Sequence, residues 1–218
     1  MKTWSFEELR DLCRKRGISS DSISNFSTYA TSLNWRYHRA KFHTEQAHNI
    51  WKDLMAQSFT FGDEKYNVAE FSYEAYVEAC VQSLHSMGDI LGQIINILIL
   101  AGHFTEDDAS IKKVARHIGI IGAAPDVLIE LNKLINSNDF CYIEAFCNTI
   151  KHRRLIKTEY RAEYGGDYRN EEGLVFVEFN YKGVTYQKTW AKDIINKYRE
   201  EIFKLVVETG LKLNEFFK

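Results

Sequence analysis

The sequence predicts a mainly α protein, a helical bundle of about six to seven helices with a β-hairpin inserted before the C-terminal helix. Three observations lead to this fold class. The 218-residue chain contains one proline, Pro125, and helix interiors exclude proline. Apolar residues recur at three- and four-residue steps along most of the chain. Aromatic and β-branched residues alternate in residues 174–190, as they do in a hairpin. We expect one domain over residues 1–218.

The N-terminal helix is predicted within residues 1–17. Ser5 and Glu8 fit the capping-box pattern at its start, in which each side chain binds a free backbone N–H of the first turn. Gly17 stands where a helix commonly ends, because glycine readily adopts a left-handed backbone. A second helix is expected from about Asp21 to Gln57, since an apolar stripe follows the helical period there.

The longest helix is predicted from about Ala69 to Ala101, after a loop or short hairpin at residues 58–67. Its last third is apolar on nearly every side, which is typical of a helix at the centre of a bundle. The apolar run Ile90–Ala101 is shorter than the ~20 residues that cross a bilayer, so we expect no membrane segment.

Two shorter helices are expected next. Thr105–Asp108 supplies N-cap residues for the first of them. Pro125 fits the first turn of the second, which continues to about Leu134, because the first turn does not need the N–H that proline lacks. Asn136–Asp139 then breaks the chain before a helix that carries the stretch FCNTIKHRRLI, residues 146–156.

The C-terminal part changes from helical to alternating character. After a polar loop at residues 163–173, Leu174–Phe179 is expected to pair with Val184–Trp190 around a turn at residues 180–183. An isolated hairpin is marginal in water, so this one should pack on the bundle or on a partner. A last amphipathic helix is predicted from about Lys192 to Phe217.

Composition narrows the function classes. Hydrophobic residues make up 45% of the chain and charged residues 27%, which is typical of a globular protein. The formal net charge is -2, so any nucleic-acid binding must come from a local basic patch. The four cysteines are widely spread and form no CxxC pair, which indicates a cytoplasmic protein with free thiols. The chain has no Walker, GxGxxG or GxSxG motif, and we expect no cofactor.

One upstream cluster has the spacing of metal ligands. Glu45 and His48 form the Glu-x-x-His pattern of di-iron sites in helical bundles, and His38 and His43 lie close by. Such a site needs a second Glu-x-x-His, which the chain does not have. We therefore predict no metal site and interpret the histidines as surface or interhelical residues.

The stretch at residues 146–156 separates into two faces on a helical projection. One face turns toward the core and carries Ile143, Phe146, Cys147, Ile150 and Arg154. Asn148 and His152, four residues apart, point together at the opposite side. Ala145, Leu155 and Ile156 flank them, so this second strip is partly apolar. Such a strip suits a subunit interface or a cleft.

Cys147, Asn148 and His152 resemble the RNxxxH signature of HEPN proteins, which are helical bundles of prokaryotic toxin–antitoxin, phage-defence and RNA-processing systems. In active HEPN ribonucleases two copies of the motif meet at a dimer cleft and cut RNA without a metal. The resemblance implies a homodimer in which His152 is the catalytic acid or base and Asn148 orients it or a phosphate. Cys147 stands at the arginine position and carries no permanent charge, which favours a protein without cleavage activity.

A run of basic residues surrounds this motif. Lys151, Arg153, Arg154, Lys157 and Arg161 are candidate RNA-binding residues, because cations in one patch bind the phosphate backbone. Tyr160 and Tyr164 are interleaved with them and are candidates for stacking on bases. The alternative interpretation is a solvated helix end whose charges complement the helix dipole.

Three functions follow from these observations, and whether the protein is an enzyme stays open. The first is a non-catalytic HEPN-like protein of a defence or toxin–antitoxin system that binds RNA or a partner protein. The second is a metal-independent endoribonuclease that uses His152 and Asn148 at a dimer cleft. The third is a helical protein-interaction module whose hairpin pairs with another chain.

Overall fold

The computed structural model describes residues 3–56, 63–163 and 171–218. Half of the loop predicted at residues 58–67 therefore lies outside the described residues, as does Tyr164, and residues 64–67 belong to a helix instead. The chain divides into two compact units that interleave along the sequence. Unit 1 contains Met1–His38, Leu84–Cys141 and Glu201–Lys218; unit 2 contains Arg39–Ser83 and Tyr142–Glu200. The single domain expected from the sequence stays a prediction.

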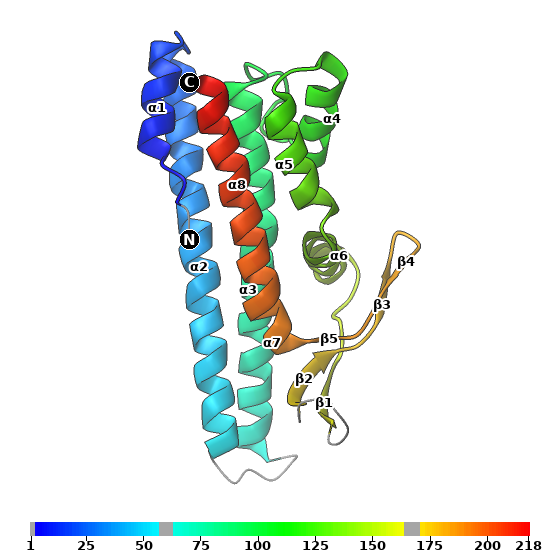
Figure 1. The fold of residues 1–218 in the computed structure, drawn as a ribbon. Coiled ribbons are helices and arrows are strands. Elements are labelled where there is room, and N and C mark those ends of the chain that lie inside the picture. Colours follow the sequence, from blue (N-terminus) through cyan, green and yellow to red (C-terminus); the bar gives the residue numbers. More distant parts are fainter. Residues whose placement is uncertain (1–2, 57–62, 164–170) are drawn as a thin grey trace. The chain divides into compact units, whose positions relative to one another are not determined.

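The predicted fold class is confirmed: the chain is mainly helical, with a small antiparallel β region before the last helix (Figure 1). The helices are α1 (Phe6–Lys15), α2 (Ser20–Ala56), α3 (Glu64–Leu98), α4 (Ile111–Ile121), α5 (Pro125–Asn136), α6 (Asn138–His152), α7 (Ala191–Asp193) and α8 (Arg199–Phe217). The strands are β1 (Thr158–Glu163), β2 (Glu171–Phe176), β3 (Phe179–Tyr181), β4 (Val184–Tyr186) and β5 (Thr189–Trp190). No helix in the described part of the chain is both long enough and apolar enough to cross a membrane.

The two longest helices lie close to their predicted positions. α2 starts one residue before the predicted Asp21, and α3 starts five residues before the predicted Ala69. The last third of α3 is buried within unit 1, as its apolar character predicted; Leu91, Ile94 and Ile95 have no exposed surface. Burial of three such side chains removes apolar surface from water on several sides of one helix, which makes it the core element of this unit.

Serine side chains cap the starts of α1, α2, α4 and α6. Ser5 Oγ accepts a hydrogen bond from the Glu8 N–H at 3.1 Å, as predicted for α1. At α4 the prediction was wrong: Ser110 is the N-cap, and Thr105 and Asp108 instead bond to each other at 3.2 Å before it. Pro125 occupies the first turn of α5 as predicted, and Ser137 caps α6.

The β region differs in part from the single predicted hairpin. The turn predicted at residues 180–183 is shorter than expected: Asn180 and Tyr181 belong to β3, and β3 and β4 pair around Lys182 and Gly183, whose φ angles of 49° and 80° fit a tight two-residue hairpin turn. The predicted pairing of residues 174–179 with residues 184–190 is confirmed, because Val175 pairs with Trp190, Phe176 with Thr189 and Phe179 with Tyr186 in one antiparallel register. The sequence did not reveal that β2 is also the middle strand of a sheet with order β1-β2-β5. Its main partner is β1, in which Thr158 pairs with Phe176.

The final helix also contains an irregularity that the sequence did not reveal. Between α7 and α8 the backbone forms a π-helical segment, Ile194–Tyr198. Its apolar side chains Ile194 and Ile195 are fully buried, as they would be in an uninterrupted α-helix. The spacing of apolar residues therefore did not reveal the π-helical turn. A single π turn inside an α-helix is rare and often marks a site with additional contacts.

Within unit 1, the segment before α1 is held on α8 by Trp4. The Trp4 indole N–H donates to the Asn214 side-chain oxygen at 3.0 Å, and the Asn214 amide donates to the Glu8 carboxylate at 2.7 Å. Glu8 of α1 is therefore hydrogen-bonded to α8. A side-chain carbon added at Gly210 would lie 2.0 Å from the Trp4 ring. The glycine therefore makes room for the indole.

Gly210→Ala should destabilise the protein by about 1–3 kcal/mol, because the added methyl group displaces the Trp4 ring from a close-packed contact. Urea unfolding measures the change. The matched control is Gly119→Ala, since that helical position has its nearest foreign atom at 3.6 Å from an added carbon. We expect this control to be neutral or stabilising, because alanine favours helix by up to about 1 kcal/mol over glycine.

Trp4→Ala provides the second test. In that background Gly210→Ala should lose most of its cost, because the ring that it displaces is gone. An equal cost in both backgrounds would show that Trp4 is not the residue that needs Gly210.

Candidate nucleic-acid interface

The candidate site begins at the end of α6 in unit 2. The N–H groups of Arg153 and Arg154 both donate to the Thr149 carbonyl, at 3.0 and 3.1 Å, and close the last turn of the helix. The chain then continues without regular structure until β1 begins. The prediction that Arg154 belongs to the core face of the helix is therefore wrong, because the helix has already ended at His152.

Three residues of the predicted core face of α6 are confirmed as buried, whereas Ile150 is only half-buried. Ile143, Phe146 and Cys147 have no exposed surface. Asn148 is half-buried, and its amide N–H donates to the Glu144 carbonyl one turn earlier at 2.8 Å. His152 is exposed. No hydrogen bond joins Asn148 to His152 in the described part of the chain, so the amide is fixed to its own helix and does not orient the imidazole.

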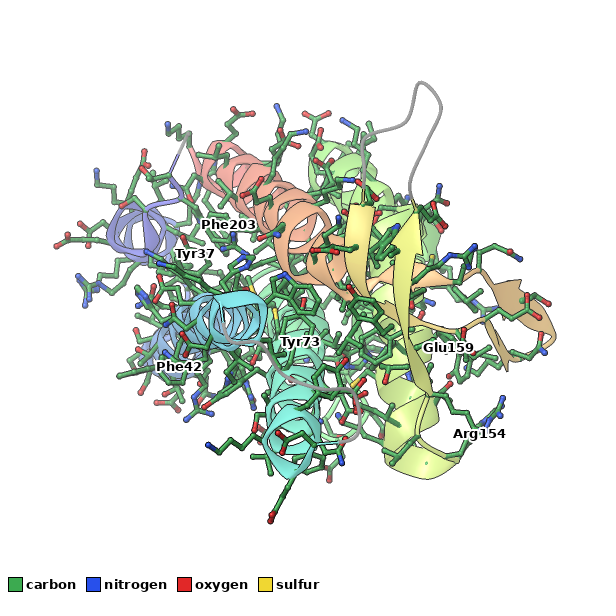
Figure 2. The ribbon with its side chains drawn as sticks, turned by 90° about the horizontal axis from the view of Figure 1, so that it is seen from below. Tyr37, Phe42, Tyr73, Arg154, Glu159 and Phe203 are labelled. Atoms are coloured by element: carbon green, nitrogen blue, oxygen red, sulfur yellow. The ribbon has the colours of Figure 1, made fainter. Side chains whose placement is uncertain are left out.

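The predicted basic residues lie together in sequence but differ in their surroundings. Lys151, Arg153, Arg154 and Lys157 are exposed, and none of them forms an ion pair with a described residue. We call residues 151–157 the basic segment. Figure 2 shows the Arg154 side chain pointing away from the ribbon, into open space. Arg161 differs, because its guanidinium forms an ion pair with the Glu163 carboxylate, with 2.6 Å between the paired atoms, and therefore already has an acidic partner within the protein.

An aromatic residue that the sequence did not single out lies beside the basic segment. Tyr181, at the end of β3, has the Arg153 guanidinium carbon 5.0 Å from its ring centroid and the Lys182 ammonium nitrogen 5.1 Å from it. These are cation–π distances. The hairpin therefore places an aromatic ring among cations. The sequence could have indicated this position, because it places an aromatic residue directly before a lysine of the predicted hairpin turn.

The tyrosines that were predicted do not occupy such a position. Tyr160 stacks on Trp51 at 6.5 Å between ring centroids, and its hydroxyl donates to the Glu172 carboxylate at 3.2 Å. The ring is thus engaged inside unit 2. Tyr164 lies outside the described residues.

The upstream histidines are held by protein contacts. The His48 ring nitrogen Nε2 and the Asn196 side-chain oxygen are 2.9 Å apart, and Glu45 lies 3.8 Å from the Lys41 ammonium group. Burial, together with the positive charge of Arg39, lowers the pKa of His43. Among the residues that the structure describes, no group of three or more His, Cys, Asp or Glu side chains is arranged to hold a metal ion.

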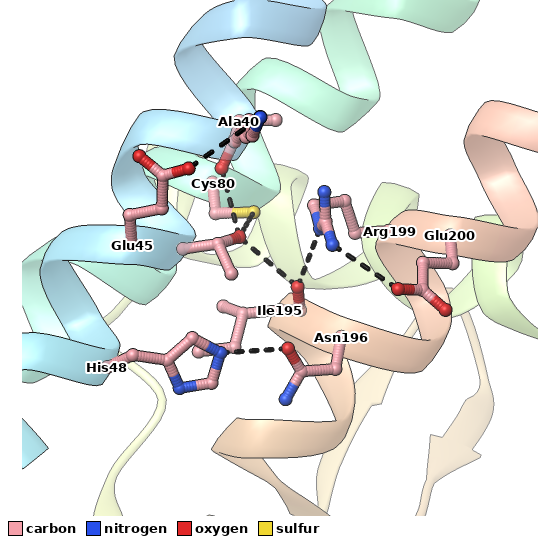
Figure 3. Close-up of polar contacts among 10 residues, drawn as sticks. Ala40, Glu45, His48, Cys80, Ile195, Asn196, Arg199 and Glu200 are labelled. Atoms are coloured by element: carbon pink, nitrogen blue, oxygen red, sulfur yellow. Dashed lines mark hydrogen bonds and ion pairs between the residues drawn. The ribbon is translucent and has the colours of Figure 1, made fainter.

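The π-helical segment is held in place by polar contacts inside unit 2 (Figure 3). The Ile195 carbonyl accepts hydrogen bonds from the Arg199 Nε–H at 2.9 Å and from the Thr44 hydroxyl at 3.2 Å. Thr44 also lies 3.0 Å from the Ala40 carbonyl and 3.7 Å from the Cys80 sulfur. Burial raises the pKa of the Cys80 thiol to about 11, which keeps it protonated and unreactive. These contacts stabilise the fold.

Thr44→Val should lower the free energy of unfolding by about 1–2 kcal/mol, because the Ile195 carbonyl loses one of its two side-chain donors. Chemical denaturation measures the loss. Thr31→Val is the matched control, since that hydroxyl is exposed on the same helix and bonds only to the Ser27 carbonyl, at 2.9 Å. If both substitutions have the same effect, the carbonyl of the π-helical segment does not depend on Thr44.

Comparison with known proteins gives little guidance. No protein-family model matches the chain, and no solved structure gives a significant match. The chain is 29% identical over 111 residues to the major core protein OPG136 precursor of variola virus (isolate Human/India/Ind3/1967). This alignment covers 47% of the chain and 12% of the viral protein. A match of this length and identity does not assign the chain to a family.

Proposed function

We propose that the protein is a non-catalytic HEPN-like protein that binds RNA through the basic segment. The observation that carries this proposal is the set of four exposed cations at Lys151, Arg153, Arg154 and Lys157, beside the ring of Tyr181. Exposed cations without carboxylate partners are available to phosphates, and their binding releases counterions from the nucleic acid. An adjacent aromatic ring adds a surface on which a base can stack.

The charge distribution supports a local interface. The whole chain has a formal net charge of -2, so RNA gains nothing from binding to its average surface. Residues 151–159 include four basic side chains, Lys or Arg, and one acidic side chain. Glu159 is exposed on β1 (Figure 2) and reduces the local excess of positive charge without cancelling it.

Two features favour binding without cleavage. Cys147, at the position of the family's arginine, is fully buried and uncharged, so it offers no positive charge to a phosphate in the transition state. Asn148 donates to its own helix backbone and leaves His152 unoriented within one chain. A metal-independent endoribonuclease that uses these two residues is therefore the second candidate.

The cellular setting rests on the resemblance of Asn148 and His152 to the HEPN motif. It implies a cytoplasmic homodimer in a prokaryotic defence or toxin–antitoxin system, in which a protein partner is an alternative ligand for the same surface. Sedimentation equilibrium on the intact chain measures the predicted dimer.

Reversing three charges of the basic segment, with Lys151→Glu, Arg154→Glu and Lys157→Glu together, should weaken RNA binding by roughly tenfold or more. Fluorescence anisotropy with a labelled, mixed-sequence single-stranded RNA measures the affinity over a series of salt concentrations. The slope of log affinity against log salt should fall by about 0.7 for each phosphate contact that is lost.

The control reverses three lysines elsewhere and changes the net charge by the same amount. Lys133, Lys204 and Lys212 are suitable, because each already pairs with a glutamate three residues away, at 2.8, 3.4 and 2.7 Å. We expect their reversal to leave the salt slope unchanged. Equal losses in both triple variants would mean that the total charge, and not the basic segment, determines the affinity.

In EDTA the protein should leave a labelled RNA uncut, because no arginine stands at the position of Cys147. Gel electrophoresis after prolonged incubation measures this, with a metal-independent ribonuclease as positive control for the substrate. Cleavage by the unmodified protein that disappears in His152→Ala would overturn the non-catalytic assignment and favour the endoribonuclease.

A further inference from the structure

Unit 1 contains a partly enclosed cavity of about 340 Å³, far in sequence from the basic segment. It lies among the start of the chain and helices α2, α3 and α8. Its walls are Thr3, Trp4, Phe6, Leu33, Asn34, Tyr37, Met87, Phe203, Val206 and Val207. Every one of these side chains is uncharged, and most are apolar. The volume lies within the range of small-molecule binding sites, and such sites are lined mainly by apolar and aromatic side chains with a few polar groups, as this one is.

Aromatic rings form much of the wall. Tyr37 of α2 stacks on Phe203 of α8 with 4.1 Å between ring centroids and 25° between ring planes, and the two side chains lie side by side in Figure 2. Trp4 and Phe6 form a second pair, edge to face, with centroids 4.6 Å apart. Flat walls of this kind favour a flat ligand, because offset-stacked and edge-to-face contacts have defined geometries.

The walls are fixed before any ligand arrives. The indole of Trp4 is fastened to Asn214 at 3.0 Å and sits over the bare backbone of Gly210. Leu33, Met87 and Val206 are buried, at most 3% exposed, and are held by the helices that carry them. A preformed cavity reduces the entropy lost on binding.

Two polar groups at the cavity are not used within the protein. Neither the Asn34 amide nor the Tyr37 hydroxyl makes a hydrogen bond to a residue that the structure describes. Both can therefore bind a polar atom at one edge of a ligand. A hydrogen-bonding site of this kind discriminates against analogues that lack the polar atom.

From this geometry we propose that the cavity of unit 1 binds a small, uncharged aromatic molecule of about two fused rings with one hydroxyl or ring N–H group. The size follows from comparison with an engineered cavity of ~150 Å³, which holds a single benzene ring. The lack of charge follows from the uncharged lining, because a buried ion without a partner is costly. The polar group of the ligand lies at the Tyr37 hydroxyl, because Tyr37 is half-buried whereas Asn34 is exposed to solvent. This site is independent of RNA binding.

The test uses 2-naphthol and naphthalene as matched probes on the intact chain. Isothermal titration should give saturable binding of 2-naphthol with one site per chain. Val207→Phe adds a ring to the wall and should weaken the binding of both probes roughly tenfold or more, because the space is filled. Tyr37→Phe should weaken 2-naphthol about fivefold and leave naphthalene unchanged, because only the hydroxyl partner is lost.

Ile129→Phe is the matched control for Val207→Phe. It makes a similar enlargement on α5 in the same unit, at a side chain that is 53% exposed and outside the cavity. We expect it to bind both probes like the unmodified protein. Circular dichroism and thermal melting check that each variant folds, and the conservative Tyr37→Phe keeps the test decisive if Val207→Phe does not fold.

Two results would overturn the proposal. One is the absence of saturable 2-naphthol binding up to the solubility limit of the probe. The other is binding that Val207→Phe and Tyr37→Phe both leave unchanged, which would place the probe elsewhere on the protein.

Discussion

The edge-to-face packing of Phe146 is the contact on which the candidate interface depends. Its ring centroid lies 4.8 Å from that of Phe176 in β2 and 6.1 Å from that of Phe179 in β3, with nearly perpendicular planes in both cases. Such pairs contribute about 0.5–1.5 kcal/mol each beyond the burial of their area. They fix the end of α6 against the strands. As a result the hairpin brings Tyr181 to Arg153, so that an aromatic ring lies beside one cation of the basic segment.

The same packing conflicts with cleavage chemistry. Cys147 follows Phe146 on the helix, and the orientation of α6 that buries the ring also buries the thiol completely. An arginine in this position would need a partner for its charge inside unit 2, and an unpaired buried charge costs several kcal/mol. Cys147, at the position where the resembled motif has its arginine, is therefore a core residue. Under the proposed function, Cys147 would be the residue that separates this protein from an active ribonuclease of the resembled family, because the packing that buries it leaves no place for an arginine.

Local signals predicted most of the helices correctly. Ser5 and Ser137 accept hydrogen bonds from backbone N–H groups three residues on, and Pro125 lacks only an N–H that the first turn of a helix leaves unbonded, so these effects are visible in a short stretch of sequence. The turn before β4 is of the same kind, because Gly183 supplies a positive φ at a defined place between two alternating runs.

Non-local contacts account for what the sequence did not reveal. β1 has no strong alternation and becomes a strand because β2 pairs with it. The π-helical segment keeps the burial pattern of an α-helix, so periodicity does not distinguish the two; its carbonyl at Ile195 is satisfied from Thr44, far away in sequence. Tyr181 escaped notice for the same reason, since its neighbour Arg153 belongs to another element. The spacing of Asn148 and His152 is visible in the sequence, whereas the contact between Tyr181 and Arg153 is visible only in the folded structure.

In the proposed binding of RNA, the two kinds of cation in the basic segment would contribute differently. Lys151, Arg154 and Lys157 are exposed and must be immobilised by a ligand, at up to ~2 kcal/mol of side-chain entropy each. Arg153 is already held over Tyr181, so it loses less freedom when a phosphate or a base arrives. Screening limits the influence of distant carboxylates to about 8 Å at physiological ionic strength, so the net charge of -2 does not decide the outcome. Affinity should therefore be spread over the exposed cations and depend on salt, whereas any preference among RNA structures should arise where Arg153 meets Tyr181.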